Sequence, residues 1–367
     1  MDDALPDRKR KGRGAVGSPA PRFDRLSRQA VDDGWFHPPE DGEEGEAPPL
    51  PTTVQADSAR TVISRNSSPD IPFEQSVNPY RGCEHGCVYC YARPTHAYLG
   101  LSPGLDFETR LFAKFDAPEL LERELRARTY RCRTVALGTN TDCYQPIERE
   151  HRITRRVLEV LAAFDHPVMI TTKSALVTRD IDLLAPMAAR RLAMVCVSVT
   201  TLDAALARTL EPRAAAPHRR LATIRALSDA GIPVAVMASP MIPGLTDPEL
   251  EDILAAAAAA GAVGAAYLLL RLPHEVKDLM AAWLEAHRPD RARRVLSLVR
   301  QCRDGRLNDP AFGSRFTGAG PYADLLRQRF HAACRRLGLA GRLQAIAALD
   351  TTAFRAPPAP GAQLALF

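Results

Sequence analysis

The sequence predicts an α/β fold built from six βα units with parallel strands. From about residue 70, short uncharged runs rich in Val, Ile, Leu and Ala alternate with longer stretches of helical periodicity. The runs are apolar at nearly every position rather than at every second one, which is typical of strands covered on both faces. The expected strands are 76–80, 134–138, 167–172, 194–200, 232–239 and 265–270.

Helices are expected between these strands. Pro118, Pro217 and Pro248 each stand where a helix would begin, and the first helical turn tolerates proline. After the sixth strand, residues 275–349 predict a mostly helical C-terminal extension that is interrupted by several glycines. The expected helices between strands are 118–127, 147–164, 181–189, 217–230 and 248–260.

Both ends of the chain lack such periodicity. Residues 1–60 contain a basic run at 8–11 and then an acidic tract rich in Pro, Gly and Glu. A segment of this composition buries too little apolar surface to offset the entropy lost on ordering, so we expect a disordered arm whose basic run is solvated. Residues 350–367 include a proline-rich spacer and are expected to form a flexible tail.

The composition narrows the class of protein. Apolar residues make up 46% and charged residues 25% of the chain, which is ordinary for a globular protein with a large core. The net charge of +5 permits a nucleic-acid partner without requiring one. Eight cysteines without an apolar secretory segment predict a cytoplasmic protein. The uncharged run 253–270 approaches the length of a membrane span, but Gly261 and Gly264 interrupt it, so no span is expected.

Three cysteines lie close together in the stretch CEHGCVYC. Cys83, Cys87 and Cys90 offer soft thiolate ligands, which suit iron–sulfur clusters and zinc. Structural zinc normally takes four ligands, whereas the next cysteine is distant at position 132. Three thiolates on a four-iron cluster would leave one iron open to another ligand. A zinc site that uses His85 or His96 as the fourth ligand, in a nucleic-acid-binding module, is the alternative interpretation.

This motif resembles a known signature. CEHGCVYC, with Tyr89 at the aromatic position, is similar to the CxxxCxΦC motif of the radical S-adenosylmethionine (SAM) enzymes. The surrounding text SVNPYRGCEHGCVYCYARPTHAYLG resembles the branch related to spore photoproduct lyase, often labelled DNA repair photolyase-like. The resemblance implies a partial (β/α)6 TIM-like barrel over residues 70–274 and a Fe4S4 cluster on the three cysteines. It also implies SAM bound at the open iron, its reductive cleavage to a 5′-deoxyadenosyl radical, and an electron donor such as flavodoxin or ferredoxin.

Cofactor contacts are expected just after the strands, because chemistry in parallel barrels gathers at the carboxyl ends of strands. The resemblance implies that Thr139 and Asn140 lie near the amino group of SAM and that Lys173 meets its carboxylate. From residue type alone, the stretch after the second strand is equally a polar turn. For Glu211 and Arg213, the alternative interpretation is a surface salt bridge. The remaining contacts implied by the resemblance are Tyr89, Ser198, Glu211, Arg213, Ile242 and Gly244.

Two further features are candidates for substrate chemistry. Cys143 follows the second strand, and its thiol would return a hydrogen atom to a substrate radical if it faced the barrel mouth; isolated cysteines are more often buried small hydrophobes. The other four cysteines are expected to be of that buried kind. Residues 312–322 interleave aromatics, glycines and an arginine. They predict either a loop that caps the barrel, which we favour, or a surface for bases and phosphates.

The last five residues, QLALF, suggest a partner. Gln363, Leu364, Leu366 and Phe367 resemble the QLxLF peptide with which bacterial repair and replication proteins dock on the DNA sliding clamp. A tail folded back on its own barrel is the alternative. Together with the lyase-like resemblance, the peptide favours an enzyme that repairs or modifies DNA bases. A radical enzyme that acts on RNA or protein remains a second possibility.

Overall fold

The computed structural model describes residues 9–24, 50–341 and 348–358. Its main sheet has the strand order β11-β10-β9-β8-β7-β6-β3-β2. The strands from β3 to β10 are mutually parallel, and β2 pairs antiparallel at one edge. This largely parallel sheet is consistent with the partial barrel that was predicted. The strands are β2 (Ile63–Arg65), β3 (Gln75–Val77), β6 (Val135–Leu137), β7 (Val168–Thr172), β8 (Ala193–Ser198), β9 (Val234–Met241), β10 (Gly264–Leu269) and β11 (Ala340–Gly341).

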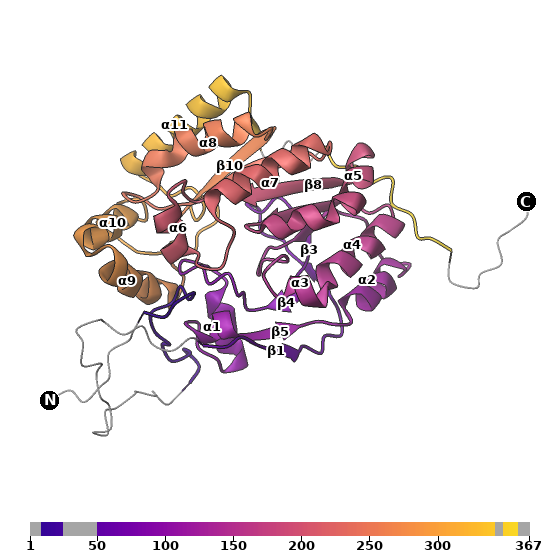
Figure 1. Ribbon diagram of the computed structural model, residues 1–367, viewed down its shortest axis with the longest axis horizontal. Coiled ribbons are helices and arrows are strands. Elements are labelled where there is room, and N and C mark those ends of the chain that lie inside the picture. The colour runs from indigo at the N-terminus through magenta and orange to yellow at the C-terminus, as the bar shows by residue number, and fades with distance from the viewer. Residues whose placement is uncertain (1–8, 25–49, 342–347, 359–367) are drawn as a thin grey trace, which may run out of the picture.

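The predicted strands and helices are present, but the first strand and two of the helices differ from the prediction. The expected strand 76–80 ends at Val77, and Tyr80–Arg81 forms β4 in a second sheet. The expected helix 147–164 is divided into α3 (Glu148–His151) and α4 (Ile153–Ala163), because Arg152 has a left-handed backbone with φ of 50°. The helix expected at 248–260 begins with a 3₁₀ turn, Asp247–Glu249, and continues as α8 (Leu250–Ala259). The helices α2 (Ala117–Leu125), α5 (Ile181–Ala189) and α7 (Pro217–Asp229) complete the layer that covers the outer face of the sheet (Figure 1).

The two faces of the sheet carry different side chains. In β7, for example, Val168 and Ile170 face the helices, whereas Met169 points to the inner face. This alternation follows from the period of two along a strand, and both faces are buried, which explains why the strands read as continuous apolar runs. The inner face is formed by Ala136, Met169, Met194, Cys196, Ala235 and Met237.

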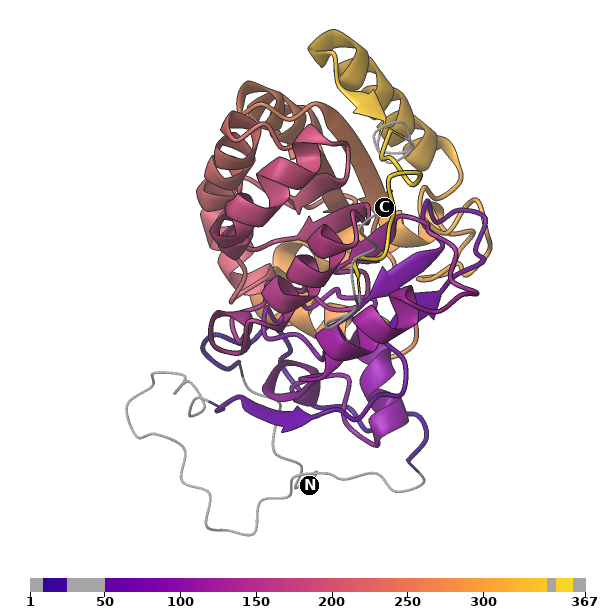
Figure 2. The ribbon, with the colours of Figure 1, turned by 90° about the vertical axis from the view of Figure 1, so that its right-hand side faces the viewer.

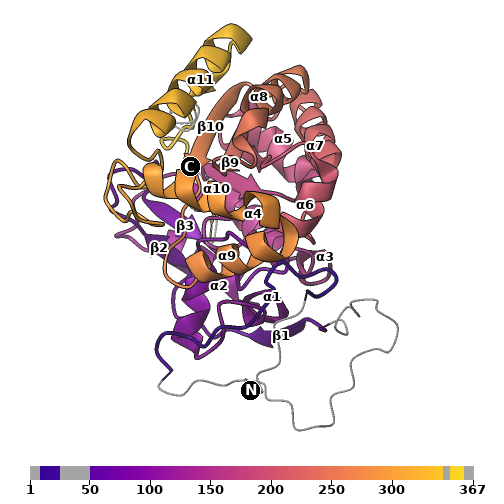
Figure 3. The same ribbon diagram turned by 90° about the vertical axis from the view of Figure 1, so that its left-hand side faces the viewer.

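The C-terminal extension is mostly helical, as predicted. It contains α9 (Val276–His287), α10 (Pro289–Gln301) and α11 (Pro321–Leu337). Helices α9 and α10 pack on each other (Figure 3), and the buried Trp283 joins the apolar cluster that contains Val88 of the cysteine stretch. Helix α11 packs on α8 and leads into β11, an edge strand that the sequence did not reveal.

A second, small sheet lies beside the main one. Its strands are β1 (Thr53–Ala56), β5 (Arg110–Ala113) and β4 (Tyr80–Arg81), and β5 is central. The disordered arm predicted for residues 1–60 is wrong for the parts described, because β1 pairs with β5 and residues 9–24 pack on the cysteine stretch. We call residues 9–24 the N-terminal strap. Residues 1–8 and 25–49 lie outside the described residues.

The chain also continues in an ordered way beyond residue 348. The ring of Phe354 packs against Tyr130, Phe164 and His166, and the Arg355 amide donates to the carbonyl of Phe164 at 3.1 Å. The flexible tail predicted from residue 350 is therefore wrong up to residue 358, because one aromatic side chain anchors it (Figure 2, yellow segment). Residues 359–367, with the QLALF peptide, lie outside the described residues. Within the described chain, every helix is too short or too polar for a bilayer crossing.

Candidate active site

A cavity of about 420 Å³ opens at the carboxyl ends of the parallel strands. Strand-end residues from β6, β7, β8 and β9 contribute to its wall, together with the cysteine stretch. The structure thus brings together two groups of residues that the sequence predicted separately. The predicted residues in the wall are Cys83, Cys87, Cys90, Thr139, Asn140, Lys173 and Ser198.

The cysteine loop, residues 82–91, is held by backbone hydrogen bonds to other parts of the chain. The amide of Cys83 donates to the carbonyl of Phe107 at 2.9 Å, and the amide of Val88 donates to that of Leu210 at 3.1 Å. Gly86 has φ of +70°, and a Cβ atom there would lie 2.7 Å from Oε2 of Glu108. Gly86 is therefore required both by the backbone conformation and by close packing.

The three thiols fit an iron–sulfur cluster. Burial raises the pKa of Cys87 to about 12 and that of Cys83 well above its ordinary value, so the bare thiols would stay protonated at neutral pH. Binding to iron deprotonates such thiols and neutralises their charge. Within the described residues, no three His, Cys, Asp or Glu side chains are close enough to hold one metal ion. Thiolates are the ligands that iron–sulfur clusters take, so the residue types fit such a cluster.

Asp142 connects the cysteine loop to the strand ends. Its carboxylate accepts hydrogen bonds from Thr172 Oγ1 at 2.8 Å and from the Lys173 amide at 2.7 Å, and it lies 3.4 Å from Nδ1 of His85. Burial raises the pKa of Asp142, but His85 and the hydrogen-bond donors outweigh burial and lower it to about 2. The sequence did not reveal this role. The only signal in the sequence was an aspartate a few residues after an apolar strand.

The turn after β6 depends on Asn78, the residue directly after β3. Oδ1 of Asn78 accepts from the Asn140 amide at 2.9 Å, and its Nδ2 donates to Thr139 Oγ1 at 3.2 Å. Gly138 has φ of +78°, and a Cβ atom there would lie 2.1 Å from the carbonyl oxygen of Thr171. The predicted polar turn is therefore real, and it presents Thr139 and Asn140 to the cavity. Asn78 was missed, because the strand was expected to continue to residue 80, whereas β3 ends at Val77.

Comparisons with known proteins agree with this geometry. The radical SAM superfamily matches residues 77–257. An uncharacterized Mycobacterium tuberculosis protein, Rv2578c, is 37% identical over 273 residues, which span 74% of this chain and 76% of that protein. This chain belongs to the radical SAM superfamily. Another uncharacterized protein, MJ0683 of Methanocaldococcus jannaschii, is 26% identical over 174 residues, or 47% of this chain and 62% of that protein.

Among solved structures, spore photoproduct lyase shares the radical SAM fold. The form complexed with a dinucleoside spore photoproduct matches with a TM-score of 0.58 and 15% identity, over 78% of this chain and 81% of that one. A mutant form of the same lyase, in which serine replaces one cysteine, matches with a TM-score of 0.57 and 16% identity, again over 78% and 81%. At this identity the likeness establishes the fold alone.

The radical SAM family implies a 4Fe-4S cluster and SAM, and the wall of the cavity fits both. Cys83, Cys87 and Cys90 would hold the cluster, which supplies one electron for reductive cleavage of SAM. Lys173 is the cation beside these thiols, with its ammonium 5.8 Å from the ring centroid of Tyr89. Burial lowers the pKa of Lys173, but the thiolate form of Cys87 and the carboxylate of Glu211 outweigh burial and raise it, so the side chain stays charged and suits a carboxylate ligand.

Glu211 and Tyr89 support the site from behind rather than line it. Glu211 is 2% exposed and forms an ion pair with Arg220, while the hydroxyls of Tyr89 and Thr200 donate to its carboxylate. Burial raises the pKa of Glu211, but the charges of Arg220 and Lys173 outweigh burial and lower it to about 2. Arg220 also donates to the carbonyl of Ser198 at 3.1 Å. The surface salt bridge considered for Glu211 is therefore wrong.

Three other predicted contacts also lie outside the cavity wall. Arg213 forms an ion pair with Glu84 at 3.0 Å. Ile242 is fully buried in the apolar cluster beneath α9 and α10. A Cβ atom on Gly244 would lie 2.9 Å from Cδ1 of Leu298, so this glycine allows α10 to approach. Direct contact of these residues with SAM remains a prediction.

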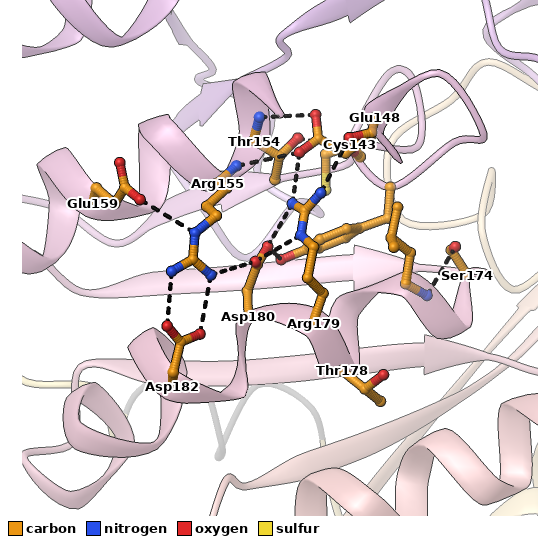
Figure 4. Close-up of polar contacts among 12 residues, drawn as sticks. Cys143, Glu148, Thr154, Arg155, Glu159, Ser174, Thr178, Arg179, Asp180 and Asp182 are labelled. Carbon is orange, nitrogen blue, oxygen red and sulfur yellow. Dashed lines mark hydrogen bonds and ion pairs between the residues drawn. The ribbon is translucent and has the colours of Figure 1, made fainter. Parts of the chain in front are cut away.

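Cys143 does not face the cavity. Its side chain is fully buried in the core between the sheet and the helices, where burial raises the pKa of the thiol. Its carbonyl accepts from Thr154 Oγ1 at 2.6 Å, and the amide of Thr154 donates to Glu148 at 3.0 Å. Figure 4 shows this anchor within a network that includes Arg179 and Asp180. The expected position at the mouth is wrong, because the tightly anchored turn directs the thiol outward; hydrogen donation itself stays an untested prediction.

Proposed function

We propose that this radical SAM enzyme repairs or modifies a base of DNA. The observation that carries the proposal is the composition of the cavity wall. Cys83, Cys87 and Cys90 share that wall with Arg271, Arg315, Phe316 and Tyr91. Guanidinium groups bind phosphates and stack on planar rings, and aromatic side chains stack on bases. A cavity with this lining suits a nucleotide next to the radical-generating group.

One further observation supports this substrate class. Spore photoproduct lyase, whose fold this chain shares, has been solved in complex with a dinucleoside spore photoproduct. The net charge of +5 permits a polyanionic partner without arguing for one.

The residues of this chain have distinct roles in the proposed reaction. Lys173, Thr139 and Asn140 would orient SAM at the cluster from the strand ends. Asp142 and Glu211 would keep the cysteine loop and β8 in register with those strand ends, since their buried carboxylates connect different elements. The apolar inner face below, with Met237, would exclude water from the reacting atoms.

The test is a comparison of substrates. Protein reconstituted anaerobically with iron and sulfide would be incubated with SAM, a reductant and ultraviolet-irradiated, alkylated or undamaged DNA. We expect DNA to stimulate 5′-deoxyadenosine formation and one class of base to change mass. The Cys87→Ala variant should lack the cluster and show neither effect. Stimulation by RNA or by a peptide, without stimulation by any DNA, would refute the DNA proposal and favour the alternative substrates.

We also propose, from the sequence alone, that QLALF docks on a DNA sliding clamp. Substitution of both Leu366 and Phe367 by alanine should abolish binding of the full chain to purified clamp in surface plasmon resonance. Iron content and SAM cleavage serve as controls for the integrity of the double variant. Unchanged clamp binding by the double variant would refute docking through this peptide.

A further inference from the structure

Arginines and phenylalanines alternate along one part of the cavity wall. Arg271, just after β10, has its Cζ atom 5.0 Å from the ring centroid of Phe316. Cζ of Arg315 lies 4.7 Å from that centroid and 4.8 Å from the centroid of Phe312. Two guanidinium groups therefore share the ring of Phe316. The capping loop favoured from the sequence is thus also part of the cavity wall.

The two arginines differ in how their charge is balanced. Arg315 donates from Nε to Oδ2 of Asp70 at 2.8 Å and forms a salt bridge with the same carboxylate. Arg271 forms no ion pair with a described carboxylate, and its buried Nε has no hydrogen-bond partner there. Burial and the charge of Arg315 both lower the pKa of Arg271. Asp70 and Asp309 raise this pKa by less. Arg271 is half-buried and lines the cavity, so a bound anion would balance its charge in a partly desolvated position.

Arg303 fixes this part of the wall in place. Its guanidinium donates to the carbonyls of Leu269 and Leu270 at 3.2 and 2.8 Å, just before Arg271. It also donates to the carbonyl of Arg315 at 2.8 Å. One buried side chain therefore joins the end of β10 to the loop that carries Phe316. The anion site is preorganised, which reduces the entropy lost when a ligand binds.

An exposed aromatic ring also lines this cavity. Tyr91, at the end of the cysteine loop, lines the cavity and is 51% exposed, and its hydroxyl donates to the carbonyl of Thr139. An exposed aromatic ring with a fixed orientation suits stacking on a base, whereas a peptide carboxylate needs no such neighbour. The combination favours a nucleotide as the source of the anion.

We propose that Arg271 binds a phosphodiester of the nucleic-acid substrate and so positions the adjoining base on the ring of Tyr91, beside the three cysteines. This inference rests on the proposed function and adds the residue that positions the nucleic-acid strand in the cavity. The guanidinium lines the cavity and offers its terminal N–H groups to a phosphate oxygen, while Phe316 holds the plane of the group.

The test is the salt dependence of binding by the full-length, reconstituted protein. The probe is a fluorescein-labelled single strand of twelve thymidylates, followed by anisotropy. For Arg271→Ala we expect roughly tenfold weaker binding and a slope of log Kd against log salt that is smaller by about 0.7, the value for one phosphate contact on a single strand. Arg271→Lys should retain most of the slope but not all of the affinity. The matched control is Arg128→Ala, an exposed cation before β6, which should behave as wild type.

Iron content and SAM cleavage without DNA should be normal in Arg271→Ala, which shows that the site is intact. If wild type binds the strand and intact Arg271→Ala keeps the same slope, the role of Arg271 is refuted while the proposed function stands. If wild type does not bind the strand, the proposed function itself fails. Displacement of the strand by poly-glutamate at equal charge concentration would overturn a phosphate-specific site.

Discussion

The barrel and the cysteine loop lie in contact but are stabilised in different ways. The barrel is held by apolar packing, in which side chains such as Leu158 of α4 are fully buried against the sheet. The cysteine loop is held mainly by buried polar groups. The guanidinium of Arg93 donates to the carbonyls of Gly86 and Cys87 at 3.0 and 2.8 Å, and it forms a salt bridge with the fully buried Glu108.

Glu108 also accepts hydrogen bonds from the N-terminal strap. The amides of Gly14 and Ala15 donate to its two carboxylate oxygens at 2.9 and 2.8 Å, and Arg13 donates to its carbonyl at 2.9 Å. Apolar packing loses stability in proportion to the atoms removed, whereas a buried ion pair with one partner missing leaves an uncompensated charge. Single changes in the two regions should therefore cost similar stability, but only those in the cysteine loop should also lower the iron content.

The largest effect is expected for Glu108→Ala. Because Arg93 would remain buried without its partner, unfolding free energy should fall by about 3–5 kcal/mol and the protein should bind less iron. The matched change is Leu158→Ala, which should cost about 2–5 kcal/mol but leave iron content per folded molecule unchanged. Urea denaturation and iron analysis measure both. Equal iron retention in the two variants would show that the loop does not depend on its polar contacts.

A pH-dependent loss of stability is expected from His166 in the barrel. Burial lowers its pKa from 6.5 to about 4, and its Nε2 lies 2.6 Å from the hydroxyl of Tyr130. The unfolded chain takes up a proton below pH 6.5 while the folded chain does not, so stability is full above pH 6.5 and falls toward pH 4. Between pH 7 and 5 the loss should be roughly 2 kcal/mol, and His166→Gln should remove it. Identical pH profiles in urea denaturation would contradict the assignment.

A smaller effect is expected where the N-terminal strap touches the cysteine loop. A Cβ atom on Gly14 would lie 1.8 Å from the carbonyl oxygen of Gly86, so Gly14→Ala must displace the strap. We expect a cost of about 1–3 kcal/mol and faster loss of iron to a chelator. Gly341→Ala is the control, since its Cβ would meet nothing within 4 Å. Iron loss at the wild-type rate in Gly14→Ala would show that the N-terminal strap does not stabilise iron binding by the cysteine loop.

The smallest effects are expected in the segment beyond residue 348. Phe354→Ala removes a ring that packs on Tyr130, Phe164 and His166 and should cost about 1–2 kcal/mol, because the ring is only partly buried. Arg355→Ala removes an exposed partner of Asp165 and should change stability by less than about 0.5 kcal/mol. Thermal unfolding compares the two. A larger loss for Arg355→Ala would mean that charge rather than the ring anchors the segment.

The strands, the helices between them and the cysteine loop were predictable because their signals are local. Apolar periodicity located the strands. Position after a strand located Thr139, Asn140 and Lys173 in the cavity wall, and position near the carboxyl end of a strand located Ser198. Cys143 shows the limit of that rule, since a residue after a strand is directed inward or outward by its own turn.

The polar supports could not be predicted, because their partners are far apart in the sequence. Glu108 contacts Gly14, 94 residues away, and Asn78 contacts Asn140, 62 residues away. Arg271 and Phe316 meet only through the fold. In the N-terminal strap, order comes from backbone amides and glycines rather than from apolar periodicity, so its composition resembled that of a disordered segment.

The N-terminal strap also determines where a shortened fragment of this protein should begin. The superfamily match begins at residue 77, and a fragment cut there would keep all three cysteines. It would nevertheless lack the two amides that Glu108 requires and the strand β1 that pairs with β5. The smallest fragment able to fold around a cluster is therefore larger than the region that sequence comparison recognises, and an affinity tag or protease site belongs before residue 9 rather than near residue 60.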